Sequence, residues 1–116
     1  MLIQVHGSGF QLRRELRNDV HEKIALVLNR FENQIGKVQV FLADLNGPKK
    51  GVDKSIRLVI DIERQPLMVV EEKGEEWPAL LESVTDRAAH SVSRQFDRVR
   101  EKKGRTSMAG APESNI

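Results

Sequence analysis

Hydrophobic residues recur along the chain with two different spacings. A spacing of two residues predicts β-strands, and a spacing of three or four predicts amphipathic helices. The helical spacing runs through Leu12, Leu16, Val20, Ile24 and Phe31, and again through the segment that follows Trp77-Pro78. The predicted elements are, in order, a strand at 2–6, a helix at 12–31, strands at 38–43, 55–63 and 67–72, and a helix from 77 to about 103.

Each predicted strand has one apolar and one more polar face, as where Val38, Val40 and Leu42 alternate with their neighbours. Such strands form a sheet that is covered on one side only, so both helices are expected on the same face. A right-handed crossover should pair the first two strands in parallel. Gly36 is interpreted as the stop of the first helix. The predicted fold class is α+β, with β-α-β-β-β-α order, a four-stranded mixed sheet and two helices on one face.

The length of 116 residues suits a single domain, expected at 1–103. Residues 104–116 show no periodicity and are expected to form a flexible tail. The absence of cysteine excludes disulfides and thiolate metal sites and fits a reducing cytoplasm. No apolar run approaches the roughly 18 residues of a membrane helix, and the N-terminus is unlike a signal peptide. A cytoplasmic location without a membrane partner is therefore expected.

Charge is unevenly distributed along the chain. Residues 61–85 hold seven acidic and two basic side chains, a net of −5, whereas residues 86–105 hold seven basic and three acidic ones, a net of +4. On a helical wheel the last helix gathers its cations in one stripe beside the buried face. The candidate RNA-binding residues are Arg87, His90, Arg94, Arg98 and Lys102 on that helix, Arg14, Arg17, Lys23 and Arg30 on the first, and Lys49, Lys50 and Lys54 in the loop. His21 lies on the same flank of the first helix as Arg14 and Arg17.

Extended rows of cations suit a polyphosphate backbone, because each contact with a phosphate releases counterions. Arginine can also bind two phosphate oxygens at once and stack on bases. Both helices are expected to point these cations outward from one shared side of the sheet. The alternative is that they only keep ordinary helices solvated. The chain has no tyrosine, and Phe41 is the only aromatic residue on a predicted strand, so the open sheet face is not a base-stacking platform.

Candidates for catalysis are weak. Gly7-Ser8-Gly9 lacks the third glycine of a nucleotide-binding loop and is best explained as a turn. The histidines are dispersed without metal-ligand spacing. Asp44 and Asp53 flank the lysine loop and could bind a cation, but turn-stabilising and salt-bridging roles are commoner. Trp77 is explained most simply as a packing residue. We expect no enzymatic activity, cofactor, metal ion or small-molecule substrate.

Several short motifs give the chain a family resemblance. Over residues 2–103 it resembles the ribosome hibernation promoting factor and ribosome-associated inhibitor family, also called sigma-54 modulation proteins. The motifs are Gly9-Phe10-Gln11-Leu12, Asn46-Gly47-Pro48-Lys49-Lys50-Gly51-Val52-Asp53-Lys54, and Glu75-Glu76-Trp77-Pro78-Ala79-Leu80. Trp77-Pro78 departs from the Tyr-Ala that is usual in the family.

The resemblance implies a fold akin to a double-stranded-RNA-binding domain and a site in the tRNA and messenger RNA channel of the small ribosomal subunit, where the protein would stop translation in resting or stressed cells. It also implies a short form, for which any pairing of ribosomes would need a separate factor. The alternative is another RNA-binding or regulatory interaction module, of the sigma-factor modulation type, on the same fold. Basic positions of the family pattern are matched by Arg17, Lys23, Arg87, Arg94 and Arg98, and those of its loop by Lys49, Lys50 and Lys54.

Overall fold

The computed structural model describes residues 1–44 and 53–107, with side chains as far as residue 98. It confirms the predicted order of strands and helices, with one short 3₁₀ helix (η1) added after the first helix. The elements are β1 (Leu2–Ser8), α1 (Arg14–Val27), η1 (Asn29–Phe31), β2 (Ile35–Asp44), β3 (Lys54–Ile62), β4 (Met68–Gly74) and α2 (Trp77–Ser107).

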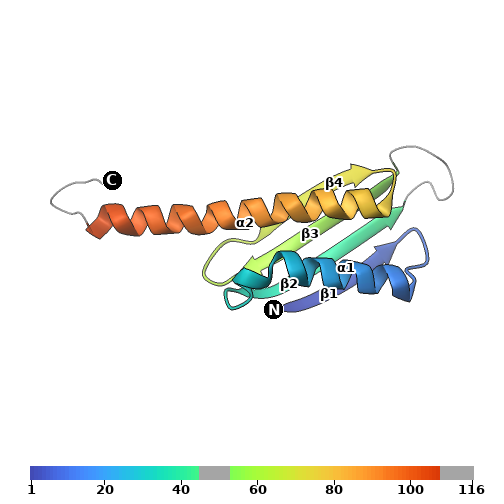
Figure 1. Cartoon of the computed structure of the whole chain (residues 1–116), viewed down its shortest axis with the longest axis horizontal. Helices are drawn as coiled ribbons and strands as arrows, with labels where there is room; N and C mark the ends of the chain where they lie inside the picture. The colour runs from blue at the N-terminus through green and yellow to red at the C-terminus, as the bar shows by residue number, and fades with distance from the viewer. Residues whose placement is uncertain (45–52, 108–116) are drawn as a thin grey trace.

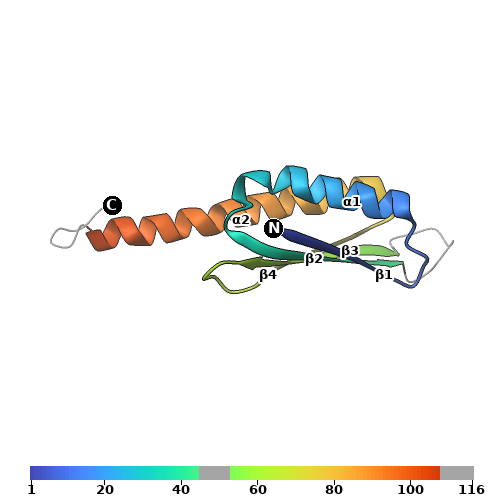
Figure 2. The ribbon, with the colours of Figure 1, turned by 90° about the horizontal axis from the view of Figure 1, so that it is seen from below.

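The four strands form one mixed sheet in the order β1-β2-β3-β4. β1 pairs with β2 in parallel, as predicted, and β2 with β3 and β3 with β4 are antiparallel. Both helices lie on one face of the sheet (Figure 2). They lie side by side and run in the same direction, with α1 over β1 and β2 and α2 over β3 and β4 (Figure 1). Within the described residues, the opposite face of the sheet carries no helix.

The core lies between the sheet and the two helices. Alternate residues of β2 and β3 point into it, and Val38, Val40, Leu58 and Ile60 have no exposed surface. This alternation is the predicted one, and it explains why only one face of the sheet is covered. Burying each such aliphatic side chain favours folding by about 1.5–3 kcal/mol. The helices contribute Val20, Ile24, Val84, Ala88 and Val92 to the same cluster.

The first helix is shorter than predicted. α1 ends at Val27, and the backbone of Leu28 leaves the helical region before a single 3₁₀ turn forms at Asn29–Phe31. The hydrophobic spacing continues through this turn because Phe31 still packs inward, stacked on Phe96 at 5.3 Å between ring centroids. Spacing alone therefore could not locate the helix end. The interpretation of Gly36 as a helix stop is wrong, because Gly36 belongs to β2.

The last helix extends beyond the sheet (Figure 1). It continues to Ser107, so residues 104–107, which the sequence assigned to the tail, are helical. Residues 108–116 and the loop at 45–52, including Lys49 and Lys50, lie outside the described residues. Within the described part of the chain, no helix has the length and hydrophobicity required to span a membrane.

Candidate nucleic-acid interface

An exposed row of basic residues follows α2 along the β4 edge of the sheet. Arg87 fixes its position, because Nη1 of Arg87 lies 3.4 Å from the carbonyl oxygen of Glu71 and 3.5 Å from Oε2 of Glu72, both on β4. These contacts are long, and the Arg87 side chain remains 60% exposed. The side chain of Lys102, which the sequence added to this row, lies outside the described residues. The row, called here the α2 row, consists of Arg87, His90, Arg94 and Arg98.

The far end of the α2 row is held by amide side chains. Nη2 of Arg98 donates a hydrogen bond to Oε1 of Gln95. Nε2 of Gln95 in turn donates to Oε1 of Gln65, in the turn between β3 and β4, at 2.6 Å. Neither amide neutralises the guanidinium. Arg98 is therefore oriented while its charge remains available to a ligand. Arg94 makes no hydrogen bond or ion pair with the described residues.

A second row of basic residues lies along the β1 edge. Arg14, Arg17 and His21 are exposed on α1, and Nη1 of Arg17 donates to the carbonyl oxygen of Val5 on β1 at 3.0 Å. Arg17 and His21 line a shallow hollow together with residues 3–6 of β1. We call Arg14, Arg17 and His21 the α1 row. It is close to the sheet edge and turned away from α2.

The two rows do not form one continuous basic face. β1 and β4 are the opposite edges of the sheet, so the α1 row and the α2 row lie on opposite flanks of the helix layer. The expectation that both helices lie on one side of the sheet is confirmed, but their basic side chains lie at opposite edges of that side. A helical wheel shows which residues of one helix share a face, but not which neighbour that face meets.

The ridge between the two rows is acidic. Glu82 on α2 faces Lys23 on α1 across this ridge. Helical spacing puts four more exposed carboxylates on the sides of the helices that point away from the sheet: Glu15, Asp19, Glu22 and Asp86. We call this surface the acidic crest; it comprises Glu15, Asp19, Glu22, Glu82 and Asp86. The electrostatic pattern across the helix layer is thus basic, acidic and basic.

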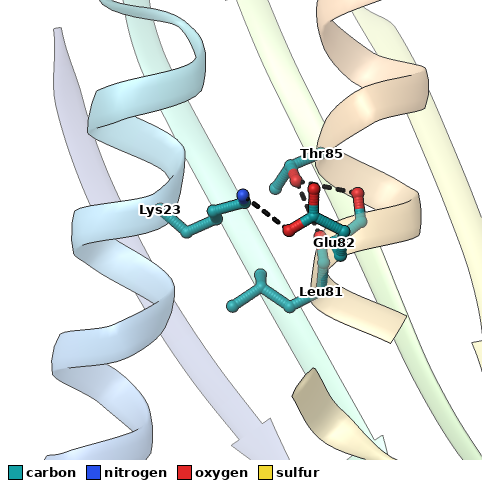
Figure 3. Close-up of polar contacts among 4 residues, drawn as sticks. All are labelled: Lys23, Leu81, Glu82 and Thr85. Carbon is teal, nitrogen blue, oxygen red and sulfur yellow. Dashed lines mark hydrogen bonds and ion pairs between the residues drawn. The ribbon is translucent and has the colours of Figure 1, made fainter. Parts of the chain in front are cut away.

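Three other predicted cations contact groups of the protein itself. Nζ of Lys23 lies 2.7 Å from Oε1 of Glu82 (Figure 3). Lys54 is only 18% exposed. Its Nζ lies 3.6 Å from a carboxylate oxygen of Asp44 and from one of Asp53. The Arg30 guanidinium lies 4.7 Å from the ring centroid of Phe31. Of these three, only Arg30 remains an exposed cation without an acidic partner among the described residues.

Three exposed arginines among the described residues, Arg13, Arg57 and Arg64, are absent from the candidates that the sequence suggested. Arg64 is exposed in the turn between β3 and β4, next to Gln65, whose side chain contacts Gln95 of α2. Helical spacing cannot reveal such a neighbour. Arg57 lies on the open sheet face, with its guanidinium 4.9 Å from the ring centroid of Phe41. Alternation along β3 would have placed it there. Since His6 stacks on Phe41 as well, this ring contacts side chains of its own sheet.

The described residues offer little for catalysis or metal binding. No group of three or more histidine, aspartate or glutamate side chains within them is arranged to hold a metal ion. Asp44 and Asp53, considered above as cation ligands, have Lys54 between them. Trp77 is half-buried and packs on Phe10, with ring centroids 5.2 Å apart, as a packing residue would.

Comparison with known proteins places the chain in a family. Solved structures that share its fold include a ribosomal subunit interface protein from Coxiella burnetii, 13% identical, with a TM-score of 0.67 over 84% of this chain and 99% of that one. They also include the Protein Y N-terminal domain from Thermus thermophilus, 23% identical, with a TM-score of 0.65 over 81% of this chain and 98% of that one. No curated protein sequence matches. The family model described as sigma 54 modulation protein / S30EA ribosomal protein matches residues 3–103. The chain therefore belongs to the sigma 54 modulation protein / S30EA ribosomal protein family, which confirms the resemblance seen in its motifs.

Proposed function

We propose that this protein is a ribosome-associated translation inhibitor that binds ribosomal RNA of the small subunit. Bound there, it would occupy the channel of tRNA and messenger RNA in resting or stressed cells. Family membership supports an association with the ribosome. The protein from Coxiella burnetii that shares the fold is a ribosomal subunit interface protein, which points the same way.

The α2 row is the observation that carries the proposal. Its members are exposed and spaced three or four residues apart, so they extend over about 16 Å of helix at a rise of 1.5 Å per residue. The described part of the row contains one ion pair, at 3.5 Å between Arg87 and Glu72. Phosphate contacts could therefore form without breaking a strong internal interaction. Each contact would release counterions and strengthen binding.

The α1 row would provide a second contact on the opposite flank. A domain with cations on two flanks can bind two RNA segments at once, as needed to fill a channel whose walls are RNA. Inhibition would then be steric. No bond is made or broken, and the protein acts by excluding tRNA and messenger RNA from the space that it occupies.

The test measures binding of purified small subunits to the labelled protein, with tRNA as competitor. Replacing both Arg94 and Arg98 by glutamine should weaken binding by roughly tenfold to a hundredfold, since two phosphate contacts of about 1 kcal/mol or more would be lost. Wild-type protein should compete with tRNA for the subunit. The matched control is Lys37→Gln/Lys73→Gln, which removes two charges from the open sheet face.

Equal affinity of the Arg94→Gln/Arg98→Gln protein and the wild type would show that the α2 row is not the interface. Simultaneous binding of tRNA and protein would contradict occupation of the channel. Absence of any subunit binding would favour the alternative of a regulatory module that acts on another partner.

A further inference from the structure

A small apolar groove lies between the first turns of α1 and α2. Its volume is about 180 Å³, and most of its lining is apolar. Leu16 and Trp77 are half-buried in its walls, Leu81 is 8% exposed, and Pro78 forms part of its border. The cations of the α1 and α2 rows do not line it. The groove is therefore separate from the proposed RNA interface.

The rim of the groove is acidic. Asp19 and Glu82 stand on either side of it, and Lys23 lies at one end with its Nζ bound to Oε1 of Glu82. Figure 3 shows this ion pair bridging the two helices above Leu81. The rim continues into the acidic crest defined above, which includes Asp86 on the next turn of α2. A phosphate ligand would be repelled here, whereas a cation would be attracted.

The size of the groove limits what can enter it. Pockets for small molecules and cofactors have volumes of about 300–1,000 Å³, larger than this one. One aliphatic side chain of another polypeptide is a better match. An exposed leucine on α1, Leu26, is 74% exposed and lies on the same side of α1 as Asp19 and Glu22. It would give such a polypeptide a second apolar contact.

We propose that this groove binds a lysine- or arginine-rich segment of another protein. An aliphatic side chain of that segment would insert between Leu16, Trp77 and Leu81, and its cations would pair with Asp19 and Asp86. A cation of the segment could also replace Lys23 on Glu82. Since exposed ion pairs contribute only about 0–1 kcal/mol, this exchange would cost little. The proposal is independent of RNA binding by the two basic rows.

The chain contains a single tryptophan, and this residue lines the groove. Its fluorescence therefore reports on the groove and on the packing of Phe10 and Lys54 around the indole. The probe is a synthetic peptide of alternating lysine and leucine, which has no fluorescence of its own. Titration of the full chain with this peptide should shift the Trp77 emission and saturate. Titration with an RNA oligonucleotide should leave the emission unchanged, because the basic rows lie elsewhere.

Two variants with equal changes of net charge distinguish specific binding of the peptide at the groove from general electrostatic attraction between the peptide and the protein. Asp19→Asn/Asp86→Asn should weaken peptide binding by roughly threefold to tenfold, the effect of losing two exposed ion pairs. The control, Asp61→Asn/Glu63→Gln, changes exposed residues at the end of β3 and should bind the peptide like the wild type. An unshifted Trp77 emission, equal weakening in both variants, or a response to RNA as strong as that to the peptide would overturn the proposal.

The peptide-binding test can be distinguished from the test of ribosome binding. The Arg94→Gln/Arg98→Gln protein, designed to lose affinity for the small subunit, should retain wild-type affinity for the peptide. Loss of peptide binding in that variant would contradict the separation of the two surfaces. Peptide binding that survives in a protein with no ribosome affinity would support the groove while the ribosomal proposal fails.

Discussion

Gly9 makes the turn from β1 toward α1. Its φ is +82°, a backbone conformation that residues other than glycine rarely adopt. A β-carbon at this position would lie 2.6 Å from the carbonyl oxygen of Asp44, at the end of β2. The turn therefore packs directly against the backbone of the neighbouring strand. This close approach determines where α1 begins, and therefore the position of Arg14 and Arg17 along the β1 edge.

Replacing Gly9 by alanine should lower the free energy of unfolding by about 2 kcal/mol or more, because the left-handed conformation and the contact with Asp44 both oppose the new methyl group. Urea unfolding followed by circular dichroism measures the effect. Gly36→Ala is the matched control, since the nearest atom to its added β-carbon is 3.9 Å away. Its effect should stay within about 1 kcal/mol. Equal losses in the two proteins would contradict this account of the turn.

Asp53 is the most deeply buried carboxylate in the described residues. Its side chain has no exposed surface, and neither of its carboxylate oxygens has a hydrogen-bond donor among the described atoms. Nζ of Lys54, 3.6 Å from Oδ1 of Asp53 and from Oδ2 of Asp44, is the positive charge that compensates both carboxylates. Such an arrangement stabilises a fold weakly, but losing one partner leaves a buried charge uncompensated.

Replacing Lys54 by methionine should therefore destabilise the protein by about 3 kcal/mol, at the lower end of the range for a broken buried pair. A second variant, Lys54→Met/Asp53→Asn, removes one of the uncompensated charges and should recover part of the loss. Thermal and urea unfolding of the three proteins would show this. Recovery would fail to appear if Lys54 contributed only through packing on the Trp77 ring, which lies 5.8 Å away.

At the scale of elements, α1 and α2 are joined by apolar contacts and by one cross-helix ion pair among the described residues. Lys23 and Glu82 meet at 2.7 Å, with side chains 26% and 60% exposed. Double-mutant cycles with Lys23→Met and Glu82→Gln should give a coupling energy of about 0.2–1 kcal/mol, typical of exposed pairs. The longer pair between Arg87 and Glu72, at 3.5 Å, serves as the comparison and should couple less strongly. A larger coupling for the longer pair would contradict the geometry.

Hydrophobic spacing was enough to predict every strand and both helices, because the burial of alternate or every third to fourth residue is what selects these elements. It could not predict their ends. Phe31 keeps the helical spacing although its backbone has already left the α-helix, and Gly36 resembles a helix stop although it lies within β2. Ends depend on local backbone geometry, which single residue types specify poorly.

The candidate interface was predictable only in part. The helical wheel could group Arg87, His90, Arg94 and Arg98, because that grouping depends on one helix. It could not show that the α1 row faces β1 while the α2 row faces β4, since that depends on how the helices sit on the sheet. Nor could it show that Lys23 and Lys54 have internal acidic partners.

Across the whole molecule, charge follows the architecture. Cations lie on both flanks of the helix layer, carboxylates lie on the crest between them, and α2 extends past the sheet (Figure 1). A flat basic face would bind one RNA surface. Two basic flanks with an acidic crest suit a protein that enters a space between RNA segments and also contacts a basic polypeptide.

The central claim is that these flanks bind ribosomal RNA of the small subunit. The most direct measurement is co-sedimentation of the protein with purified small subunits through sucrose gradients at a series of salt concentrations. The account predicts that the protein sediments with the subunit at low salt and is released steeply as salt rises. A plot of the logarithm of the affinity against the logarithm of the salt concentration gives a negative slope. In the Arg94→Gln/Arg98→Gln protein this slope should be less steep than in the wild type by about one to two units. A protein that stays at the top of the gradient at every salt concentration would contradict the account.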